Sequence, residues 1–289
     1  MKATGMTTGY GRRTALSTVR AVLAVARKEW IYFLRYPTWI IILGVLPLCF
    51  VAQFIYTAKA FSGSAGVATP TFVRLAGTGD YVGYITIGMS VWIWLVTALQ
   101  DVGSTLRNEQ LQGTLEQVWM CPIPRMVLLL GRCLVNLLTN AIWIGSALLE
   151  AHFLFGFRLS GDLGLSVLAL ALSTSLMFGI GILFAALVVL LKEANSLVQL
   201  VQNTLLVLCG VIVPVATFPG WVQTLSSWIP VTWAVQGLRA ALLSPSAWSA
   251  FRPYAARLTA GAVLLPLIGY AAFLYTDRVT RRRGTLQNY

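Results

Sequence analysis

The sequence predicts an all-α protein that crosses a membrane several times. Of its 289 residues 57% are hydrophobic and 10% are charged, and the mean hydropathy is +0.77. A soluble domain carries about 25% charged residues, so this chain lacks the side chains to cover a globule with polar surface. Apolar runs near the ~20 residues that cross a bilayer recur along the chain. This composition excludes an ordinary soluble enzyme, a disordered protein and a small secreted scaffold.

The net charge of +12 comes from 21 Lys and Arg residues against 9 Asp and Glu residues. These cations lie at the ends of apolar runs, where positive-inside topology explains them better than nucleic-acid binding does. We therefore expect no nucleic-acid partner. The four cysteines form no C-x-x-C pair and His152 is the single histidine, so neither a metal site nor a disulfide framework is expected.

The N-terminal region is predicted to form a flexible tail over residues 1–16 and an amphipathic helix over 17–36, which Pro37 ends. Such a helix lies in the membrane interface with its cations at the headgroups. The alternative is a plain basic flank of the first span. The apolar face carries Val22, Ala26, Trp30 and Phe33, and the basic side carries Arg20, Arg27, Lys28 and Arg35.

Residues 17–289 are expected to form one transmembrane domain with six spans. Lys and Arg residues are concentrated on the side of the two chain ends, which places both termini in the cytoplasm, with Arg239 counted on the opposite side. Residues 218–256 alternate prolines with apolar, tryptophan-containing patches, which predicts short outer helices that lie at the membrane interface or re-enter the membrane where protein shields them. The predicted spans cover about 38–58, 82–104, 126–150, 164–191, 197–217 and 257–276.

The loop over residues 105–125, between the second and third spans, contains the most informative motif. Gly113 interrupts the helix that leaves the second span, and Thr114 with Gln117 forms a capping box that starts a new one. We predict a short amphipathic helix that docks in the groove of a partner protein; an ordered connector is the alternative. Its apolar face carries Leu115, Val118 and Trp119, and it stops at Pro122 and Pro124.

These features together resemble the permease subunit of ABC-2-type transporters, over about residues 20–283. The resemblance includes R-K-E-W at 27–30 and the segment from Pro214 to Arg239, which is similar to the family's outer re-entrant helices. Gln236 departs from the acidic residue that many relatives carry there, so no charge-dependent role is implied at that position. The matching loop residues are Glu109, Gly113, Thr114, Leu115, Glu116, Pro122 and Pro124.

The resemblance implies two paired permease subunits, as a homodimer or a heterodimer, in the inner membrane of a prokaryote. Each subunit would engage a separate ATP-binding subunit, which supplies ATP and Mg. The chain itself contains no G-x-x-x-x-G-K-[ST] motif, so it is not expected to be an enzyme or to bind a cofactor. The residues implied in coupling to the ATPase are Arg27, Lys28, Glu29, Glu109, Gly113, Thr114, Leu115, Glu116, Trp119 and Pro122.

Polar and aromatic residues inside the spans suggest where cargo passes, because polar groups are costly in lipid. The resemblance implies that the first, second and fifth spans line the pathway. The candidates are Gln53, Trp92, Gln199 and Asn203. Hydrogen bonding between helices is the alternative, and it is preferred for Asn136 and Asn140, which lie on one stripe of the third span. Gly179 and Gly181 are expected to permit close helix packing.

A drug-like or lipid-like amphiphile is the expected cargo, because the pathway candidates have few fixed charges. A lipid-linked polysaccharide or teichoic acid is the second choice, since aromatic side chains also stack on sugars. An ATP-independent carrier and a lipid-modifying membrane enzyme are alternatives of another class. The carrier leaves the capped loop helix without a role, and the enzyme requires clustered acid, base or metal-binding residues that the sequence does not show.

Overall fold

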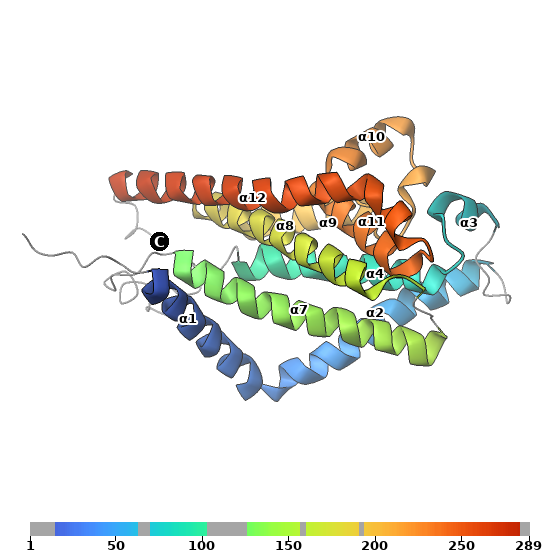
Figure 1. The fold of residues 1–289 in the computed structure, drawn as a ribbon, viewed down its shortest axis with the longest axis horizontal. Coiled ribbons are helices and arrows are strands. Elements are labelled where there is room, and N and C mark those ends of the chain that lie inside the picture. The colour runs from blue at the N-terminus through green and yellow to red at the C-terminus, as the bar shows by residue number, and fades with distance from the viewer. Residues whose placement is uncertain (1–14, 63–69, 103–125, 157–159, 191–193, 284–289) are drawn as a thin grey trace, which may run out of the picture.

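The computed structural model describes residues 15–62, 70–102, 126–156, 160–190 and 194–283. This described part contains helices and no strands, which confirms the all-α class (Figure 1). The predicted loop 105–125 and most of the predicted tail 1–16 lie outside the described residues. The helices are α1 (Ala15–Arg35), α2 (Pro37–Ser62), α3 (Pro70–Ala76), α4 (Tyr81–Thr97), α7 (Met126–Phe155), α8 (Leu163–Leu190), α9 (Ala194–Leu208), α10 (Gly220–Trp228), α11 (Pro230–Leu243) and α12 (Ala247–Arg283), with a π-helical turn η1 (Ala98–Val102) and a 3₁₀ turn η2 (Val215–Thr217).

Four helices within the described residues are long and apolar enough to cross a membrane. They correspond to the predicted second, third, fourth and sixth spans, and they cover Tyr81–Gln100, Val127–Phe155, Leu163–Leu187 and Ala247–Thr276. The predicted first and fifth spans contain shorter apolar stretches, Gly44–Thr57 in α2 and Val198–Leu208 in α9. The protein is therefore a multi-pass membrane protein whose six-span count rests on α2 and α9.

The predicted fifth span, 197–217, is wrong at its C-terminal boundary. α9 ends at Leu208, and Gly210 then adopts a φ of +68°, a left-handed conformation that glycine reaches without steric cost. The chain continues through Pro214 into η2 and does not extend the helix. Because the residues on both sides of Gly210 are apolar, hydropathy alone did not predict that the helix ends there.

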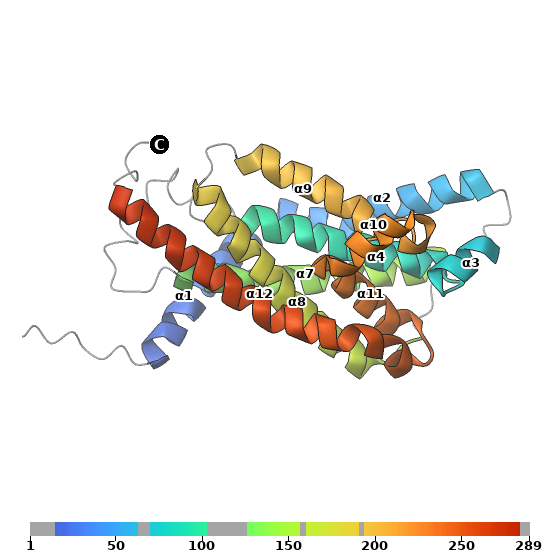
Figure 2. The ribbon, with the colours of Figure 1, turned by 90° about the horizontal axis from the view of Figure 1, so that it is seen from above.

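The helices form an elongated bundle with α4 at its centre (Figures 1 and 2). Buried side chains follow α4 from Tyr84 to Leu95 and join those of α8, α11 and α12 in one core. α7 packs against α1, α2 and α4, and α8 packs along α12. α1 begins and α12 ends at the same end of the bundle, which agrees with an even number of spans.

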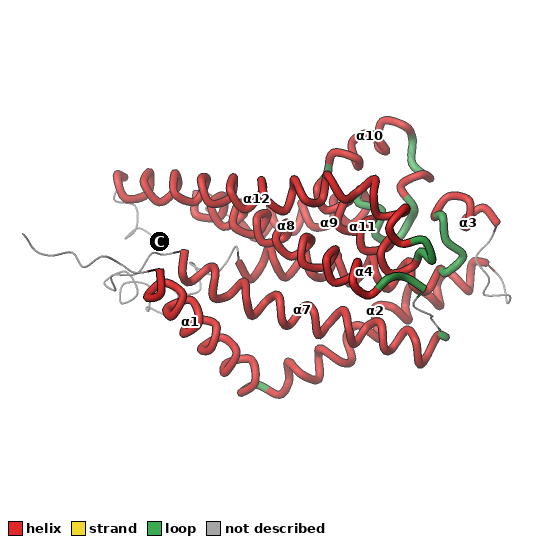
Figure 3. The backbone as a smooth tube through the Cα atoms, viewed as in Figure 1, coloured by secondary structure: helices red, strands yellow, loops and turns green. Residues whose placement is uncertain are grey.

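The helices α3, α10 and α11 gather at the opposite end, where most of the loops among the described residues also lie (Figure 3). α10 carries two exposed tryptophans, Trp221 and Trp228, at 71% and 76%. α11 is buried along most of its length. Its last carbonyls accept hydrogen bonds from the backbone N–H of Gly161 and from the hydroxyls of Ser160 and Ser166. A buried helix end needs such donors.

The predicted last span, 257–276, is too short. α12 starts ten residues earlier, at Ala247, and ends at Arg283, so Pro253 lies inside the helix. The early start buries Phe251, which lies 3.4 Å from the position of a Cβ on Gly237 of α11. This packing stabilises a helical turn that proline alone would disfavour.

The close packing predicted for Gly179 is confirmed. A Cβ there would lie 2.5 Å from the carbonyl carbon of Leu265 in α12. From the other side, a Cβ on Gly269 would lie 2.8 Å from the carbonyl oxygen of Gly179. Glycine on both helices therefore allows the backbones of α8 and α12 to touch, as in small-residue contacts of membrane helices.

Candidate functional site

The first part of the candidate site joins α1 to the start of α7. A Cβ on Gly131 would lie 2.5 Å from Cγ1 of Val25, so the two helices meet with almost no side chain between them. Beside this contact, Nε of Arg132 lies 3.4 Å from Oε1 of Glu29, and Nζ of Lys28 lies 3.8 Å from the same oxygen. α7 begins at Met126, directly after the predicted loop 105–125, so these contacts join α1 to the helix that follows the predicted loop.

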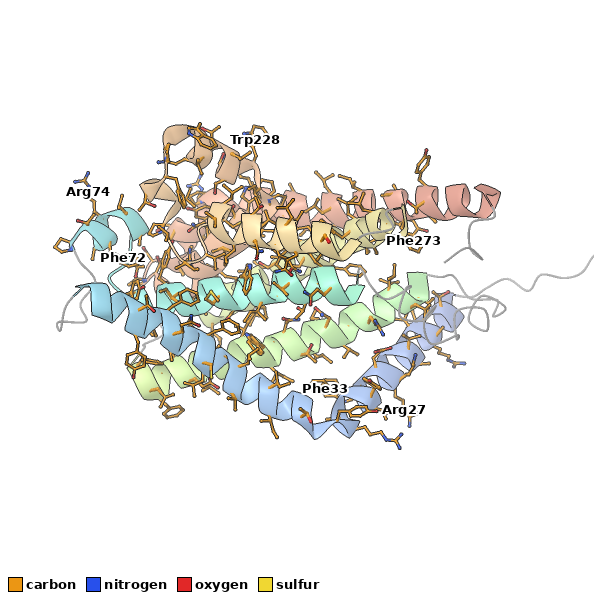
Figure 4. All side chains as sticks on the ribbon, turned by 180° about the vertical axis from the view of Figure 1, so that it is seen from behind. Arg27, Phe33, Phe72, Arg74, Trp228 and Phe273 are labelled. Atoms are coloured by element: carbon orange, nitrogen blue, oxygen red, sulfur yellow. The ribbon has the colours of Figure 1, made fainter. Side chains whose placement is uncertain are left out.

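The three predicted coupling residues on α1 point in different directions. Glu29 faces α7 with its side chain 16% exposed, while Lys28 is largely exposed. Arg27 is exposed and points away from the bundle (Figure 4). The pairing of Glu29 with Arg132 was missed in the sequence, although opposite charges in two apolar segments were a signal for it. The other predicted coupling residues, Glu109, Gly113, Thr114, Leu115, Glu116, Trp119 and Pro122, lie outside the described residues.

We expect the Glu29–Arg132 pair to couple α1 and α7 energetically. In a double-mutant cycle of Glu29→Gln and Arg132→Gln, unfolding of the detergent-solubilised protein should give a coupling energy of about 0.5–1 kcal/mol. The pair is partly shielded from water, so its coupling energy should exceed that of the weakest ion pairs on protein surfaces. A matched cycle of Arg27→Gln with Arg132→Gln should give no coupling. Equal coupling in both cycles would show that the pair is not specific.

The second part of the candidate site lies between α4 and α9. Nε1 of Trp92 donates to the carbonyl oxygen of Gln202 at 3.5 Å, and Nε2 of Gln202 donates to the carbonyl oxygen of Val96 at 3.5 Å. Gln202 is therefore buried, whereas the predicted pathway residues Gln199 and Asn203 are exposed. Gln53, on α2, is also exposed. Of the four pathway candidates, only Trp92 forms a hydrogen bond between two of the helices that the resemblance implies in the pathway, α4 and α9.

The polar stripe on α7 bonds helices together, as preferred from the sequence. Nδ2 of Asn140 lies 2.8 Å from the carbonyl oxygen and 2.9 Å from Oδ1 of Asn136. The same nitrogen lies 3.2 Å from Oγ1 of Thr97 on α4. These bonds connect α7 to α4 and leave Asn140 buried, so the stripe is part of the bundle and not an open polar surface.

The third part is a buried arginine that the sequence assigned to the outer surface. Arg239 on α11 is 4% exposed. Its Nε and Nη2 donate to the carbonyl oxygen of Tyr84 at 3.2 and 3.0 Å, and its guanidinium carbon lies 3.4 Å from the centroid of the Tyr84 ring. Nη1 donates to the carbonyl oxygen of Gly210 at 2.8 Å, and Nη2 to that of Val211 at 2.7 Å. We call this group the Arg239 cage.

The Arg239 cage joins three elements, which are α4, α11 and the segment that follows α9. The carbonyls of Gly210 and Val211 become available because α9 ends just before them, and a cation is favoured at a helix C-terminus. Hydrogen bonds to a charged group contribute about 1.5–3 kcal/mol each. Among the described residues no carboxylate pairs with Arg239. An arginine remains protonated in proteins, so these carbonyls and the Tyr84 ring stabilise its buried charge.

α3, which was not predicted, packs against the Tyr84 ring of the Arg239 cage. Phe72 of α3 packs edge-on against Tyr81 and Tyr84, with ring centroids 5.2 and 5.4 Å apart.

Asp80 caps α4 by accepting a hydrogen bond from the backbone N–H of Gly83 at 2.8 Å. Burial raises the pKa of the Asp80 carboxyl, and the hydrogen bonds from Gly83 and Val82 act in the opposite direction.

The described residues contain no group of three or more His, Cys, Asp or Glu side chains that is placed to hold a metal ion. The arrangement consists of contacts between helices. Its charged and polar side chains connect helices at two ends of the bundle, at the start of α7 and at the end of α9.

Comparison with known proteins identifies the class to which this fold belongs. Residues 20–243 match the family model of the ABC-2 type transporter, and the chain belongs to that family. It is 28% identical over 152 residues to the probable doxorubicin resistance ABC transporter permease protein DrrC of Mycobacterium tuberculosis, which covers 50% of this chain and 52% of the relative. The chain thus spans about half the length of that relative.

A second relative is matched over more of its length. The daunorubicin resistance ABC transporter permease protein DrrB1 of Streptomyces coeruleorubidus is 24% identical over 233 residues, 79% of this chain and 77% of the relative. The resemblance stated from the sequence motifs is therefore confirmed at the level of the family, and the relatives are permease proteins of ABC transporters.

Proposed function

We propose that this chain is the transmembrane permease subunit of an ABC-2-type exporter for a drug-like or lipid-like amphiphile. The family match over residues 20–243 is the observation that supports it most directly. The relatives are named for resistance to doxorubicin and daunorubicin, which favours an amphiphilic drug over a lipid-linked polysaccharide. Family membership also favours an ATP-driven transporter over an ATP-independent carrier or a lipid-modifying enzyme.

In this proposal α2 and α9 complete a set of six spans, with α10 and α11 as the outer helices before the last span. Both termini lie in the cytoplasm of a prokaryote, and the chain sits in the inner membrane as one of two permease subunits. The common location of the start of α1 and the end of α12 supports this topology (Figure 1). Arg27 and Arg35 then face anionic headgroups on the cytoplasmic side.

A separate ATP-binding subunit drives the proposed exporter and holds the ATP and Mg. It docks on the loop 105–125 and on α1. The close contact of α1 with α7 at Gly131 supports a common movement of the two helices, because a displacement of one helix would bring it into steric contact with the other. The pathway for the cargo runs along α2, α4 and α9, with Gln53, Trp92, Gln199 and Asn203 as its candidate side chains.

Purification of the wild-type chain from its native membranes tests the proposed function. We expect an ATP-binding protein to co-purify, and the isolated complex to hydrolyse ATP. Cells that express both proteins should accumulate less daunorubicin than cells that express the permease with a hydrolysis-deficient partner. Daunorubicin retention equal in both strains would contradict the drug cargo. Failure to recover any ATP-binding protein, in a detergent that preserves other membrane complexes, would contradict the transporter itself.

A further inference from the structure

We propose that the Arg239 cage is the fixed point about which α9 swings during transport, so that α9 acts as a lever anchored at its outer end. The inference rests on the proposed function, because it describes how the pathway opens. Arg239 is in this view a positioning residue: it fixes the C-terminal end of α9 to α4 and α11, while the N-terminal part of α9 separates from α4.

The Arg239 cage holds the C-terminal end of α9 strongly because one side chain bonds to two separate elements at once. Arg239 donates to carbonyls from two separate elements, Tyr84 on α4 and Gly210 with Val211 after α9. Opening this contact would leave a buried guanidinium without its partners and the carbonyl oxygen of Val211 without the Arg239 donor, while the carbonyl oxygen of Gly210 would keep only the Tyr84 hydroxyl at 3.3 Å. The cage therefore remains closed while weaker contacts break.

The inner part of α9 is held much less firmly. Its two hydrogen bonds to α4, through Trp92 and Gln202, are both at the long limit of 3.5 Å. Among the side chains described on α9, Val198 and Gln202 are buried, and one whole face is exposed. That face carries Ser196, Gln199, Leu200, Asn203, Thr204 and Val207. Separation from α4 thus breaks few contacts at this end.

The chain geometry allows a swing at the anchored end. Gly210 has a φ of +68° and α9 ends two residues before it, so the helix is not continued rigidly into η2. In Figure 2 the C-terminal end of α9 meets α10, while its N-terminal end points toward the other end of the bundle. With a rise of 1.5 Å per residue, Val207 lies about 4.5 Å and Ser196 about 21 Å along the axis from Gly210.

Distances between spin labels in the assembled transporter test this inference. Ser196→Cys and Val207→Cys place labels on the exposed face of α9, and Leu267→Cys provides an exposed reference on α12. The native cysteines are replaced by alanine after export is shown to be retained. The complex with its ATP-binding subunit is studied in lipid nanodiscs, diluted with unlabelled permease, without nucleotide and with ATP plus vanadate. We expect the label at Ser196 to move about five times as far as that at Val207.

Substitutions of arginine provide the second measurement. Lysine keeps the charge at 239 but cannot reach carbonyls of two elements in a planar fork. In Arg239→Lys we expect a broader distance distribution between Val207 and Leu267 and reduced export, with the ATP-binding subunit still bound and active. Arg252→Met, which removes an exposed arginine from α12, is the matched control and should behave as wild type.

The outcomes separate the lever from the proposed function. Equal movement of the two α9 labels, or no movement of either, in a complex that retains an active ATP-binding subunit overturns the lever alone. A wild-type distribution at Val207 in Arg239→Lys also overturns it. Absence of any ATP-binding subunit from the purified complex overturns the proposed function, and the lever with it.

Discussion

Deletion of residues 113–119 is expected to abolish recovery of an ATP-binding subunit and all ATP-driven export. The loop sequence supports this strong effect, because its capping box and apolar face predict a short amphipathic helix that docks in a groove of the partner protein. Tryptophan is frequent among the few interface residues that dominate binding, so Trp119→Ala alone should cost at least about 2 kcal/mol, or a roughly 30-fold weaker Kd. Pull-down from solubilised membranes measures both.

Two further variants make the loop experiment specific. Glu116→Arg reverses a charge within the predicted contact and should reduce recovery of the ATP-binding subunit at least tenfold, about 1.4 kcal/mol. Gln112→Ala changes a polar side chain just before the capping box and should leave recovery unchanged. Full recovery with the deletion variant, at wild-type levels in the membrane, would show that the partner docks elsewhere.

Gly88→Leu is expected to prevent stable folding of the outer half of the protein. Gly88 lies on α4 beneath the Arg239 cage, and a Cβ there would collide with the carbonyl group of Val211 and with Nη2 of Arg239. Overpacking costs about 1–3 kcal/mol, and each displaced charged hydrogen bond adds about 1.5–3 kcal/mol. We expect a total loss of about 3–5 kcal/mol, which is large against ordinary protein stability. Thermal unfolding and monodispersity in detergent measure it.

Gly145→Leu is the matched control for Gly88→Leu. Gly145 also lies within a helix, but no heavy atom lies within 4 Å of a Cβ built on it. Leucine there should be neutral or slightly stabilising, since it improves helix propensity by up to about 1 kcal/mol. If both leucine variants destabilise the protein equally, the close approach of α4 to Val211 does not explain the effect of substituting Gly88.

Much of the helical framework was predictable because it depends on local sequence. Hydropathy over about 20 residues located α4, α7, α8 and α12, and periodicity located α1 before Pro37. The interpretation of Asn136 and Asn140 as helix–helix bonding was also correct, since a polar side chain in an apolar helix needs a nearby partner. Gly179 followed from the same reasoning about small residues.

The contacts that organise the candidate site were not predictable, since they join distant parts of the chain. The hydrogen-bond partners of Arg239 are backbone carbonyls, one of them 155 residues away, and a carbonyl has no side-chain signature in sequence. The same limit hid the pairing of Glu29 with Arg132 and the choice of Gln202, not Gln199, as the buried glutamine of α9.

The sequence by itself thus determined which segments are helical and apolar enough for a membrane, because helix formation and hydrophobicity act over neighbouring residues. It also contained the motifs that placed the chain in its family. Only the tertiary structure decided that α9 ends at Leu208, that α11 is buried, and that Arg239 holds both to α4. These outcomes depend on which carbonyls the fold leaves without partners, and that is known only once the helices are packed.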